Sequence, residues 1–349
     1  MRSFEHGYLL ETPISHSLLM SVRALGEFRG RQALYRQQSP EVLETLRRVA
    51  MVQSAESSNR IEGITVAPGR ADRLVARKAK PQNRPEQEVA GYRDLLASIH
   101  AKHKTLSLST DLILEWHRTL YRYTGEAGGH WKPKDNVIWE LRPDGRRVVR
   151  FKPVSALAAP DFMGRLVRLF NEGLAEGQTE PLLLIASFII DFECVHPFAD
   201  GNGRIGRLLT LLLLYQCGYE VGRYVSLERI VEESKETYYE ALLKSSQNWH
   251  AAQHDLRPWW NYFLGMLTAA YKEFEARVGT VSSARGGKRR MVRGAVQLLP
   301  ERFAFDDLRQ ACPGVSGPTL RRALAELARE GKLRCLGRGP AALWERRRG

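Results

Sequence analysis

The sequence predicts a mainly helical protein that carries one β-hairpin and a small basic domain at its C-terminal end. Three observations support this fold class. Apolar residues recur at helical spacing along most of the chain, two short β-prone runs flank Pro143-Asp144-Gly145, and a small, basic segment at 281–290 separates the last residues from the rest. With 349 residues, the chain is long enough for one large domain or for two to three small ones.

The composition is that of an ordinary soluble globular protein, with 43% hydrophobic and 26% charged residues. The four cysteines are widely spaced and form no CxxC pair, which argues against a zinc site or a disulfide framework and fits a reducing compartment. The N-terminal residues lack the continuous apolar core of a secretory signal, and the apolar runs 181–190 and 208–215 are too short to span a bilayer. We therefore expect a cytoplasmic protein with no membrane partner.

The helices follow one another along the chain. The first clear helical stripe covers 39–58, with Ser39 as a plausible N-cap and Pro40 at the first helical position. After a basic stretch at 70–84, which we expect to be irregular, the pattern predicts helices and the hairpin in this order: helices at 85–100 and 111–123, the hairpin at 136–151, and helices at 160–176, 181–190, 208–215 and 234–249.

The segment HPFADGNGRIGR, residues 196–207, lies between the two apolar runs and contains more glycine than a structural loop needs. Gly201, Asn202 and Gly203 can turn successive backbone N–H groups toward one point, at the positive N-terminal end of the following helix. Arg204 and Arg207, three residues apart, can both reach phosphate oxygens. These features together predict a phosphate-binding loop.

Two further residues of this segment add chemistry to the phosphate site. Asp200 has the wrong charge for a phosphate, so it fits best as a ligand of Mg²⁺ that itself binds phosphates. His196 is the nearby group that titrates close to neutrality and can act as a base. The alternative is a glycine-rich helix cap with a buried histidine, but the number of specified positions favours a functional loop.

The segment resembles the Fic motif, HxFx(D/E)GNGRxxR, at every fixed position. Most Fic proteins with this motif transfer AMP from ATP to a hydroxyl of a target protein and use Mg²⁺. The resemblance implies a Fic-fold helical bundle with a β-hairpin flap. It also implies roles for individual residues: His196 as general base, Asp200 as metal ligand, Gly201, Asn202 and Gly203 as phosphate cradle, Arg204 and Arg207 on the β- and γ-phosphates, Phe198 as anchor of the loop, and Tyr239 near the adenine.

Two other segments extend this resemblance. The hairpin at 136–151 is similar in position to the Fic flap, which pins the backbone of the target by strand addition. His130 stands where many family members have an arginine, and the hairpin could instead simply cap the helical bundle. The segment SSNRIEG, residues 57–63, resembles the inhibitory pattern (S/T)xxxE(G/N), here Ser58, Glu62 and Gly63.

The inhibitory resemblance implies a helix at about 40–63 that presents Glu62 to the second arginine of the motif, Arg207. This pairing would withhold Arg207 from the γ-phosphate of ATP. The alternative interpretation is an ordinary helix C-terminus closed by Gly63.

The C-terminal residues 290–349 resemble a winged helix-turn-helix, with helices at 291–299, 305–311 and 316–331 followed by two short strands. From Ala276 onward, 17 lysines and arginines face six acidic residues, so eleven of the fourteen net positive charges lie here. Arg321 and Arg322 on the third helix and Arg338 at the wing tip predict contact with duplex DNA. Winged helices also mediate protein contacts, which is the alternative.

The predicted organisation is an N-terminal helical region (1–100), a Fic catalytic core (101–275), a linker (276–289) and a winged helix (290–349). The predicted function is a self-inhibited protein adenylyltransferase that uses ATP and Mg²⁺ and docks an unknown target protein on the flap. Two alternatives stay open: a DNA-binding transcriptional regulator whose Fic domain senses nucleotide, and an enzyme that removes AMP at the same site. The sequence leaves the oligomeric state open, including a homodimer.

Overall fold

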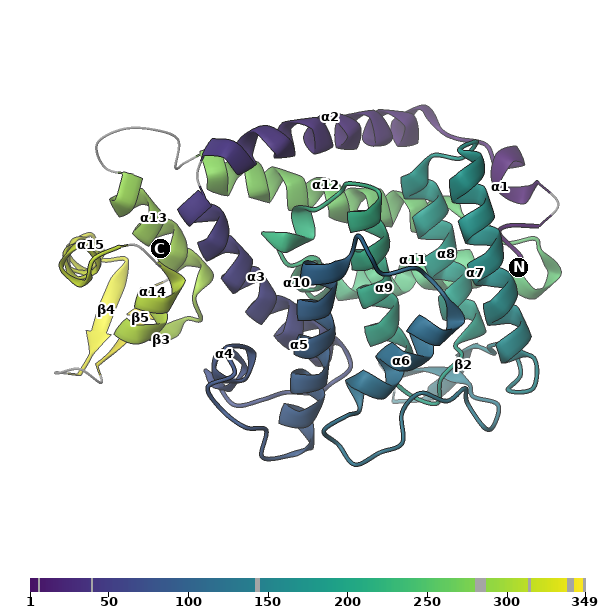
Figure 1. The fold of residues 1–349 in the computed structure, drawn as a ribbon, viewed down its shortest axis with the longest axis horizontal. Helices are drawn as coiled ribbons and strands as arrows, with labels where there is room; N and C mark the ends of the chain where they lie inside the picture. The colour runs from purple at the N-terminus through teal and green to yellow at the C-terminus, as the bar shows by residue number, and fades with distance from the viewer. Residues whose placement is uncertain are drawn as a thin grey trace.

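The computed structural model describes residues 1–5, 7–38, 40–141, 145–279, 287–312, 315–337 and 342–347, and helices dominate them (Figure 1). The helices are α1 (Tyr8–Glu11), α2 (His16–Gln38), α3 (Pro40–Ile61), α4 (Arg70–Val75), α5 (Arg84–Lys102), α6 (Thr110–Leu120), α7 (Ala159–Glu176), α8 (Pro181–Val195), α9 (Asn202–Gln216), α10 (Leu227–Glu233), α11 (Lys235–Ser246), α12 (Arg257–Gly279), α13 (Gly287–Leu298), α14 (Phe305–Ala311) and α15 (Gly317–Arg329), with short 3₁₀ turns at Val221–Arg223 and Trp249–Ala251. The strands are β1 (Ile138–Leu141), β2 (Arg147–Phe151), β3 (Arg302–Ala304), β4 (Leu333–Leu336) and β5 (Leu343–Arg346).

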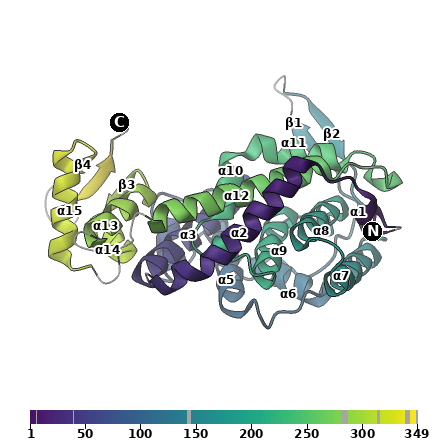
Figure 2. The same ribbon diagram turned by 90° about the horizontal axis from the view of Figure 1, so that it is seen from above.

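Helices α8 and α9 form the centre of the larger part of the molecule. Both are buried around nearly their whole circumference, as expected for α8, whose sequence is largely apolar, whereas α9 also buries Arg204 and Arg207 in its first turns. Helix α8 packs against α7, α11 and α12, whereas α9 packs against α3, α5 and α6. Figure 2 shows this arrangement from above, with α2 running across the outside of the bundle. The loop between α8 and α9 is therefore held by two central helices.

The N-terminal half differs from the sequence-based expectation at α2 and α4 and agrees with it at α3. Helix α2 was not predicted individually, and it lies along α12 (Figure 1). Helix α3 starts at Pro40, with Ser39 outside the described residues, and ends at Ile61, which lies beyond the helical stripe at 39–58 and agrees with the helix expected at about 40–63. Helix α4 replaces part of the stretch expected to be irregular, because it buries Ala71 and Leu74 next to α5.

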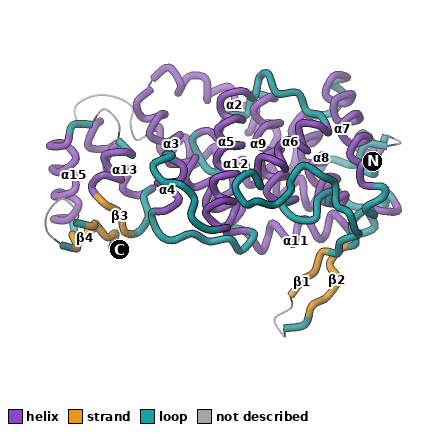
Figure 3. The backbone as a smooth tube through the Cα atoms, turned by 60° about the horizontal axis from the view of Figure 1, so that its bottom comes forward, coloured by secondary structure: helices purple, strands orange, loops and turns teal. Residues whose placement is uncertain are grey.

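The predicted hairpin is confirmed as an antiparallel pair of β1 and β2. Trp139 faces Val149 and Leu141 faces Arg147 across the two strands. Of the predicted turn, Pro143 and Asp144 lie outside the described residues, while Gly145 has φ 80°, which suits glycine. The hairpin projects away from the helical body (Figure 3).

The C-terminal part contains α13, α14 and α15 with an antiparallel sheet in the order β3-β5-β4. Leu320, Leu324 and Leu327 of α15 are buried and form the apolar face of this helix. Strand β3 was not predicted because a three-residue strand leaves no measurable periodicity. The identification of this part as a winged helix-turn-helix stays a prediction.

The linker predicted at 276–289 is longer than the segment that separates α12 from α13 in the structure. Helix α12 continues to Gly279 and α13 begins at Gly287, so helix covers both ends of the expected linker. Residues 280–286 lie outside the described residues. Among the helices that the structure describes, none has both the length and the apolar composition of a membrane span.

Candidate active site

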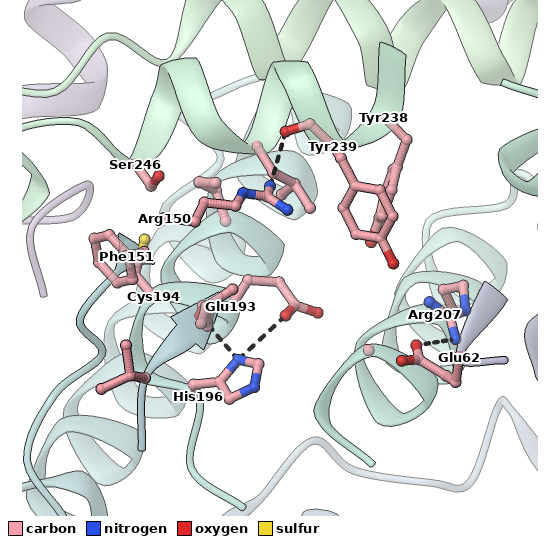
Figure 4. Close-up of a pocket in the computed structure, with 15 residues that line it drawn as sticks. Glu62, Arg150, Phe151, Glu193, Cys194, His196, Arg207, Tyr238, Tyr239 and Ser246 are labelled. Atoms are coloured by element: carbon pink, nitrogen blue, oxygen red, sulfur yellow. Dashed lines mark hydrogen bonds and ion pairs between the residues drawn. The ribbon is translucent and has the colours of Figure 1, made fainter. Parts of the chain in front are cut away.

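A cavity of about 260 Å³ opens beside the loop that joins α8 to α9 (Figure 4). Five elements line it: the end of α3, both strands of the hairpin, the end of α8, the first turns of α9, and α11. The lining includes residues of the predicted loop, the predicted inhibitory segment and the predicted aromatic contact, namely His196, Gly203, Arg207, Glu62, Tyr238 and Tyr239. The fold thus brings together segments that are more than 170 residues apart in the sequence.

His196 ends helix α8 in a left-handed conformation with φ 47°, and its backbone N–H donates to the Phe192 carbonyl at 2.9 Å. Its ring nitrogen Nδ1 lies 3.3 Å from the carbonyl oxygen of Glu193 and 3.6 Å from Oε2 of the same residue. A proton on Nδ1 is therefore directed to Glu193, which leaves Nε2 as the basic nitrogen. The imidazole lines the cavity and is 21% exposed.

The loop after His196 is closed by the side chain of Asn202. Its Oδ1 accepts the N–H of Phe198 at 2.9 Å, and its Nδ2 donates to the carbonyl of Phe198 at 2.8 Å. Phe198 itself is fully buried and stacks on His117 with ring centroids 3.9 Å apart. The buried amide of Asn202 therefore shapes the loop, and its expected part in a phosphate cradle stays a prediction.

Asp200 lies at the outer side of the loop, and its side chain is 63% exposed. Its carboxylate accepts the N–H of Gly201 at 2.7 Å and the hydroxyl of Tyr121 at 2.8 Å, and Arg204 lies 3.3 Å away. Burial of part of the carboxyl disfavours its charge, but Arg204 and these two hydrogen bonds outweigh that effect and lower the pKa of Asp200. The group is an exposed carboxylate at neutral pH, which suits a ligand of a hard cation.

Arg204 does not line the cavity, contrary to the expectation that it contacts phosphates. Its guanidinium is fully buried, forms an ion pair with Glu88 of α5, and donates to the Tyr121 hydroxyl at 2.8 Å. Residues three apart on a helix point in directions that differ by about 60°. Arg204 consequently points to α5 and α6, whereas Arg207 points to α3. Glu88 on α5 is the ion-pair partner that holds Arg204 in this direction. The sequence shows Glu88 as one charged residue of a helix and does not show which residue it pairs with.

Removing the partner of Arg204 should weaken the fold. Because both members of this ion pair are buried, Glu88→Ala leaves Arg204 with the longer contact to the exposed carboxylate of Asp200, and we expect the variant to lower the free energy of unfolding by about 3 kcal/mol. Chemical denaturation followed by circular dichroism measures this. Glu126→Ala is the matched control, because Glu126 forms an exposed ion pair with Arg84 and should contribute less than about 1 kcal/mol. Equal effects of the two variants would contradict the assignment.

Helix α3 brings Glu62 to the start of α9. Gly63 adopts φ 81° and lets the chain turn, so that the N–H of Ile64 donates back to the Asn59 carbonyl at 2.9 Å. Glu62 Oε1 then accepts from Arg207 Nη2 at 2.8 Å. A Cβ atom built on Gly203 would lie 2.5 Å from the same Glu62 oxygen. The carboxylate thus rests against the first turn of α9, where a helix attracts anions.

Arg207 is held by α3 at more than one point. Its Nε donates to the hydroxyl of Ser58 at 2.9 Å, and Nη2 donates to the Ser58 carbonyl at 2.9 Å. Burial disfavours the guanidinium charge, but the Glu62 carboxylate outweighs burial and raises the pKa of Arg207. Ser58 and Glu62 therefore both contact Arg207, whereas Gly63 closes the helix that carries them.

The remaining wall of the cavity is aromatic and basic. Tyr238 is buried, and the ring of Tyr239 lies 4.9 Å from the guanidinium of Arg150, which also donates to the Tyr239 carbonyl at 2.7 Å. Arg150 comes from β2, so it joins the hairpin to α11 across the cavity. Sequence reasoning missed Arg150 and Glu193, because nothing local marks a residue that reaches the site only through the tertiary fold.

Residues 107–214 match the model of the Fic/DOC family. This segment is a Fic domain. It spans the hairpin, α8 and most of α9, whereas Glu62 and Tyr239 lie outside it and are contributed by α3 and α11. The site described above is thus built around the Fic domain with additions from both of its flanks.

Two proteins of known name are similar in sequence to parts of this chain. A Fido domain-containing protein from Dictyostelium discoideum is 37% identical over 54 residues, which cover 16% of this chain and 38% of that protein. A protein named protein adenylyltransferase Fic from Nematostella vectensis is 26% identical over 180 residues, covering 49% and 39%. The chain therefore spans less than two fifths of the length of these relatives.

Solved structures resemble most of the chain. A Fic family protein from Desulfovibrio desulfuricans aligns with a TM-score of 0.60 at 22% identity, covering 97% of this chain and 98% of that one. A Fic domain containing signaling protein from Bacteroides thetaiotaomicron aligns with a TM-score of 0.60 at 23% identity, covering 76% and 100%. At this identity the comparison shows a shared fold.

The predicted DNA-binding residues lie away from the Fic domain. Arg321 and Arg322 are exposed on α15, with the guanidinium of Arg321 lying 5.2 Å from the centroid of the Phe305 ring. Arg338 lies outside the described residues. The basic helix and the cavity are thus separate features of the chain.

Proposed function

We propose that the protein is an adenylyltransferase that moves AMP from ATP to a Ser, Thr or Tyr hydroxyl of a target protein and is restrained by Glu62. The observation that carries the proposal is the shared cavity, in which a basic histidine, a helix N-terminus and a buried arginine face one space beside a hairpin. Fic domains typically transfer AMP, and a relative named protein adenylyltransferase matches about half of the chain.

In the proposed reaction, the target hydroxyl attacks the α-phosphorus of ATP. Its proton passes to Nε2 of His196, while the bond between the α-phosphorus and the bridging oxygen breaks and pyrophosphate leaves. The Nδ1 side of the imidazole faces Glu193, which stabilises the protonated ring once the proton has been taken up. Arg207 and the N-terminus of α9 supply positive charge for the phosphates.

The residues at the site fit the cofactors that this chemistry requires. Mg²⁺ usually binds through one or two carboxylates together with substrate phosphates, so the single exposed carboxylate of Asp200 is a suitable partner. Among the described residues, no cluster of three or more metal-binding side chains exists that would hold a metal without the nucleotide. A bound Mg²⁺ would neutralise charge on the phosphates of ATP. Tyr239 and Arg150 offer a flat surface for the adenine.

The proposed restraint follows from competition for Arg207. The Glu62 carboxylate accepts a hydrogen bond from the Arg207 guanidinium and lies against Gly203 in the first turn of α9. The proposed triphosphate would bind to both of these groups. The hairpin is proposed to hold the target by strand addition, because its strands line the cavity and project from the body.

Parallel incubations with ATP labelled at the α- or γ-phosphate test the proposed function, in a Glu62→Gly background and with lysate as a source of targets. The proposal expects α-label on protein and no γ-label. Transfer of γ-label would identify a kinase, and nucleotide binding without transfer would identify a sensor; either result would refute the proposal.

A second proposed activity concerns the C-terminal part. Because Arg321 and Arg322 are exposed on α15, we propose that this helix contacts phosphates of duplex DNA. The 349-residue chain with Arg321→Ala and Arg322→Ala should bind DNA more weakly, and its slope of log K against log salt should shrink by about two. Fluorescence anisotropy measures both quantities. Arg329→Ala, on the last turn of the same helix, is the control, and salt-insensitive or absent binding would indicate a protein-docking module.

A further inference from the structure

A buried lysine lies next to the loop that carries His196, and the proposed reaction does not use it. Lys132 precedes strand β1, is 3% exposed and lies outside the lining of the cavity beside His196. Burial lowers the pKa of its ammonium to about 8, although the carboxylate of Asp135 opposes the shift. Lysine is seldom this buried unless acceptors match its charge, so the acceptors around Lys132 indicate its role.

Lys132 contacts the chain on both sides of His196. Its Nζ donates to the carbonyl of Val195, the last residue of α8, at 3.2 Å. Its backbone N–H donates to the carbonyl of Pro197 at 2.8 Å. A helix leaves its last carbonyls without partners inside the helix, and a cation at this end is favourable. One residue therefore holds the carbonyls immediately before and after His196.

Lys132 also fixes the side chain of Asn136. Its Nζ donates to Oδ1 of Asn136 at 2.8 Å. An ammonium has three donors and no acceptor, so the amide must present its oxygen to Lys132 and its nitrogen to the loop. The amide nitrogen Nδ2 donates to the Phe198 carbonyl at 3.0 Å and lies 3.5 Å from the His196 carbonyl. Without the ammonium, this orientation of the amide loses its anchor.

The loop needs this support because His196 has an unfavourable backbone conformation. Its φ of 47° lies in the left-handed region, which is strained for a residue with a Cβ atom and persists where surrounding contacts fix it. The carbonyls of residues 195, 197 and 198 all accept hydrogen bonds from Lys132 or Asn136. In this conformation Nδ1 of the imidazole lies 3.3 Å from the Glu193 carbonyl oxygen. The orientation of the ring thus depends on how the loop is held.

The segment that contains Lys132 and Asn136 also joins this loop to the hairpin. Asn136 is followed by Val137 and Ile138, both of which line the cavity beside His196. At the other end of the hairpin, the N–H of Val154 donates to the Cys194 carbonyl at 3.3 Å. Both ends of the hairpin are therefore attached to the end of α8 or to the loop that follows it.

We propose that Lys132 is a positioning residue for the transfer of AMP, and that it sets the direction of the His196 imidazole by holding Asn136 and the carbonyls around His196. Because Lys132 lies outside the cavity, it acts through the loop. The inference rests on the proposed function, since the direction of the ring affects the rate only if Nε2 takes up a proton. Loss of the ammonium should slow this step and leave the binding of ATP unchanged.

Kinetics of α-label transfer in the Glu62→Gly background test this role. Lys132→Met removes the charge from a side chain of similar length, and it should lower kcat about tenfold and leave the KM for ATP unchanged, because misplacement of a reacting group slows the chemical step. Asn136→Ala should have the same effect. The double variant should lose no more than either single variant, because the two residues act as one unit. Lys134→Met, at an exposed lysine of the same segment, is the control and should keep full activity.

Nitrogen NMR of the histidine rings gives a second readout that needs no AMP transfer. The signal of His196 is the one that disappears in His196→Ala. It should shift in Lys132→Met and in Asn136→Ala but not in Lys134→Met. Melting curves establish that each variant is folded, and Asn136→Ala, which leaves the lysine in place, covers the case in which Lys132→Met is not.

The two readouts separate this inference from the proposed function. An unchanged His196 signal in both variants overturns the positioning role, whether or not the protein transfers AMP. If Glu62→Gly is active, an unchanged kcat in both variants, an equal loss in Lys134→Met, or losses that multiply in the double variant would also overturn it. If Glu62→Gly transfers no α-label but the His196 signal shifts as expected, the proposed function is refuted and the effect of Lys132 on the ring is supported.

Discussion

His196→Ala should reduce AMP transfer about 10²-fold or more while ATP still binds. The imidazole, whose Nδ1 faces Glu193, is the proposed acceptor of the proton of the attacking hydroxyl, and general-base catalysis of this kind contributes at least that factor. ATP affinity should change little, because Arg207 and the first turn of α9 lie on the other side of the cavity from the ring (Figure 4).

The measurement is best made in the Glu62→Gly background, where turnover is expected to be high. Transfer of α-label reports the rate, and the rise in melting temperature with ATP reports binding. His16→Ala is a suitable control, because His16 lies exposed on α2, outside the cavity. Near-normal transfer by His196→Ala would exclude the proposed role of the histidine.

Glu62→Gly should raise AMP transfer, including transfer to the protein itself, by about 10²-fold. Glu62 pairs with Arg207, and under the proposed restraint this pairing keeps the triphosphate from the guanidinium and misplaces the α-phosphorus for in-line attack. Displacements on the ångström scale cost about 10²-fold in rate. Transfer of α-label from ATP, compared at equal protein concentration, measures the gain.

The order of effects in combined variants is the decisive control. Arg207→Ala should stay inactive in the Glu62→Gly background, because the released partner is then missing. Glu62→Ala separates charge from backbone effects, since it removes the carboxylate without adding a second glycine beside Gly63. If only the glycine variant is active, loosening of the end of α3 is the cause, and if the double variant with Arg207→Ala is active, the restraint acts elsewhere.

The sequence predicts the local features of this protein well, because helix periodicity and turn chemistry are properties of neighbouring residues. The hairpin, the end of α3 at Gly63 and the loop after α8 all follow from such patterns. The direction in which a long side chain points does not follow from local sequence patterns. Arg204 and Arg207 look equivalent in the sequence, and their different surroundings depend on Glu88 and Glu62, which come from other helices.

The sequence also did not predict the shortest helices and strands or some of the residues that line the cavity. Helix α4 and strand β3 are too short to show a period, and their formation depends on α5 and β5 as packing partners. Arg150 and Glu193 enter the cavity only because the hairpin and α8 meet there. Tertiary packing determines where these short elements and cavity residues lie, and tertiary packing cannot be derived from the local patterns of a single sequence.

The pairing of Glu62 with Arg207 lies within one chain, so the proposed restraint should not depend on protein concentration. An intramolecular partner acts at an effective concentration that the fold sets and that dilution does not change. ATP therefore competes with a carboxylate whose local abundance is constant, so the specific activity of the protein should be the same at nanomolar and micromolar concentration. A separate inhibitory subunit, by contrast, would dissociate on dilution and release its enzyme.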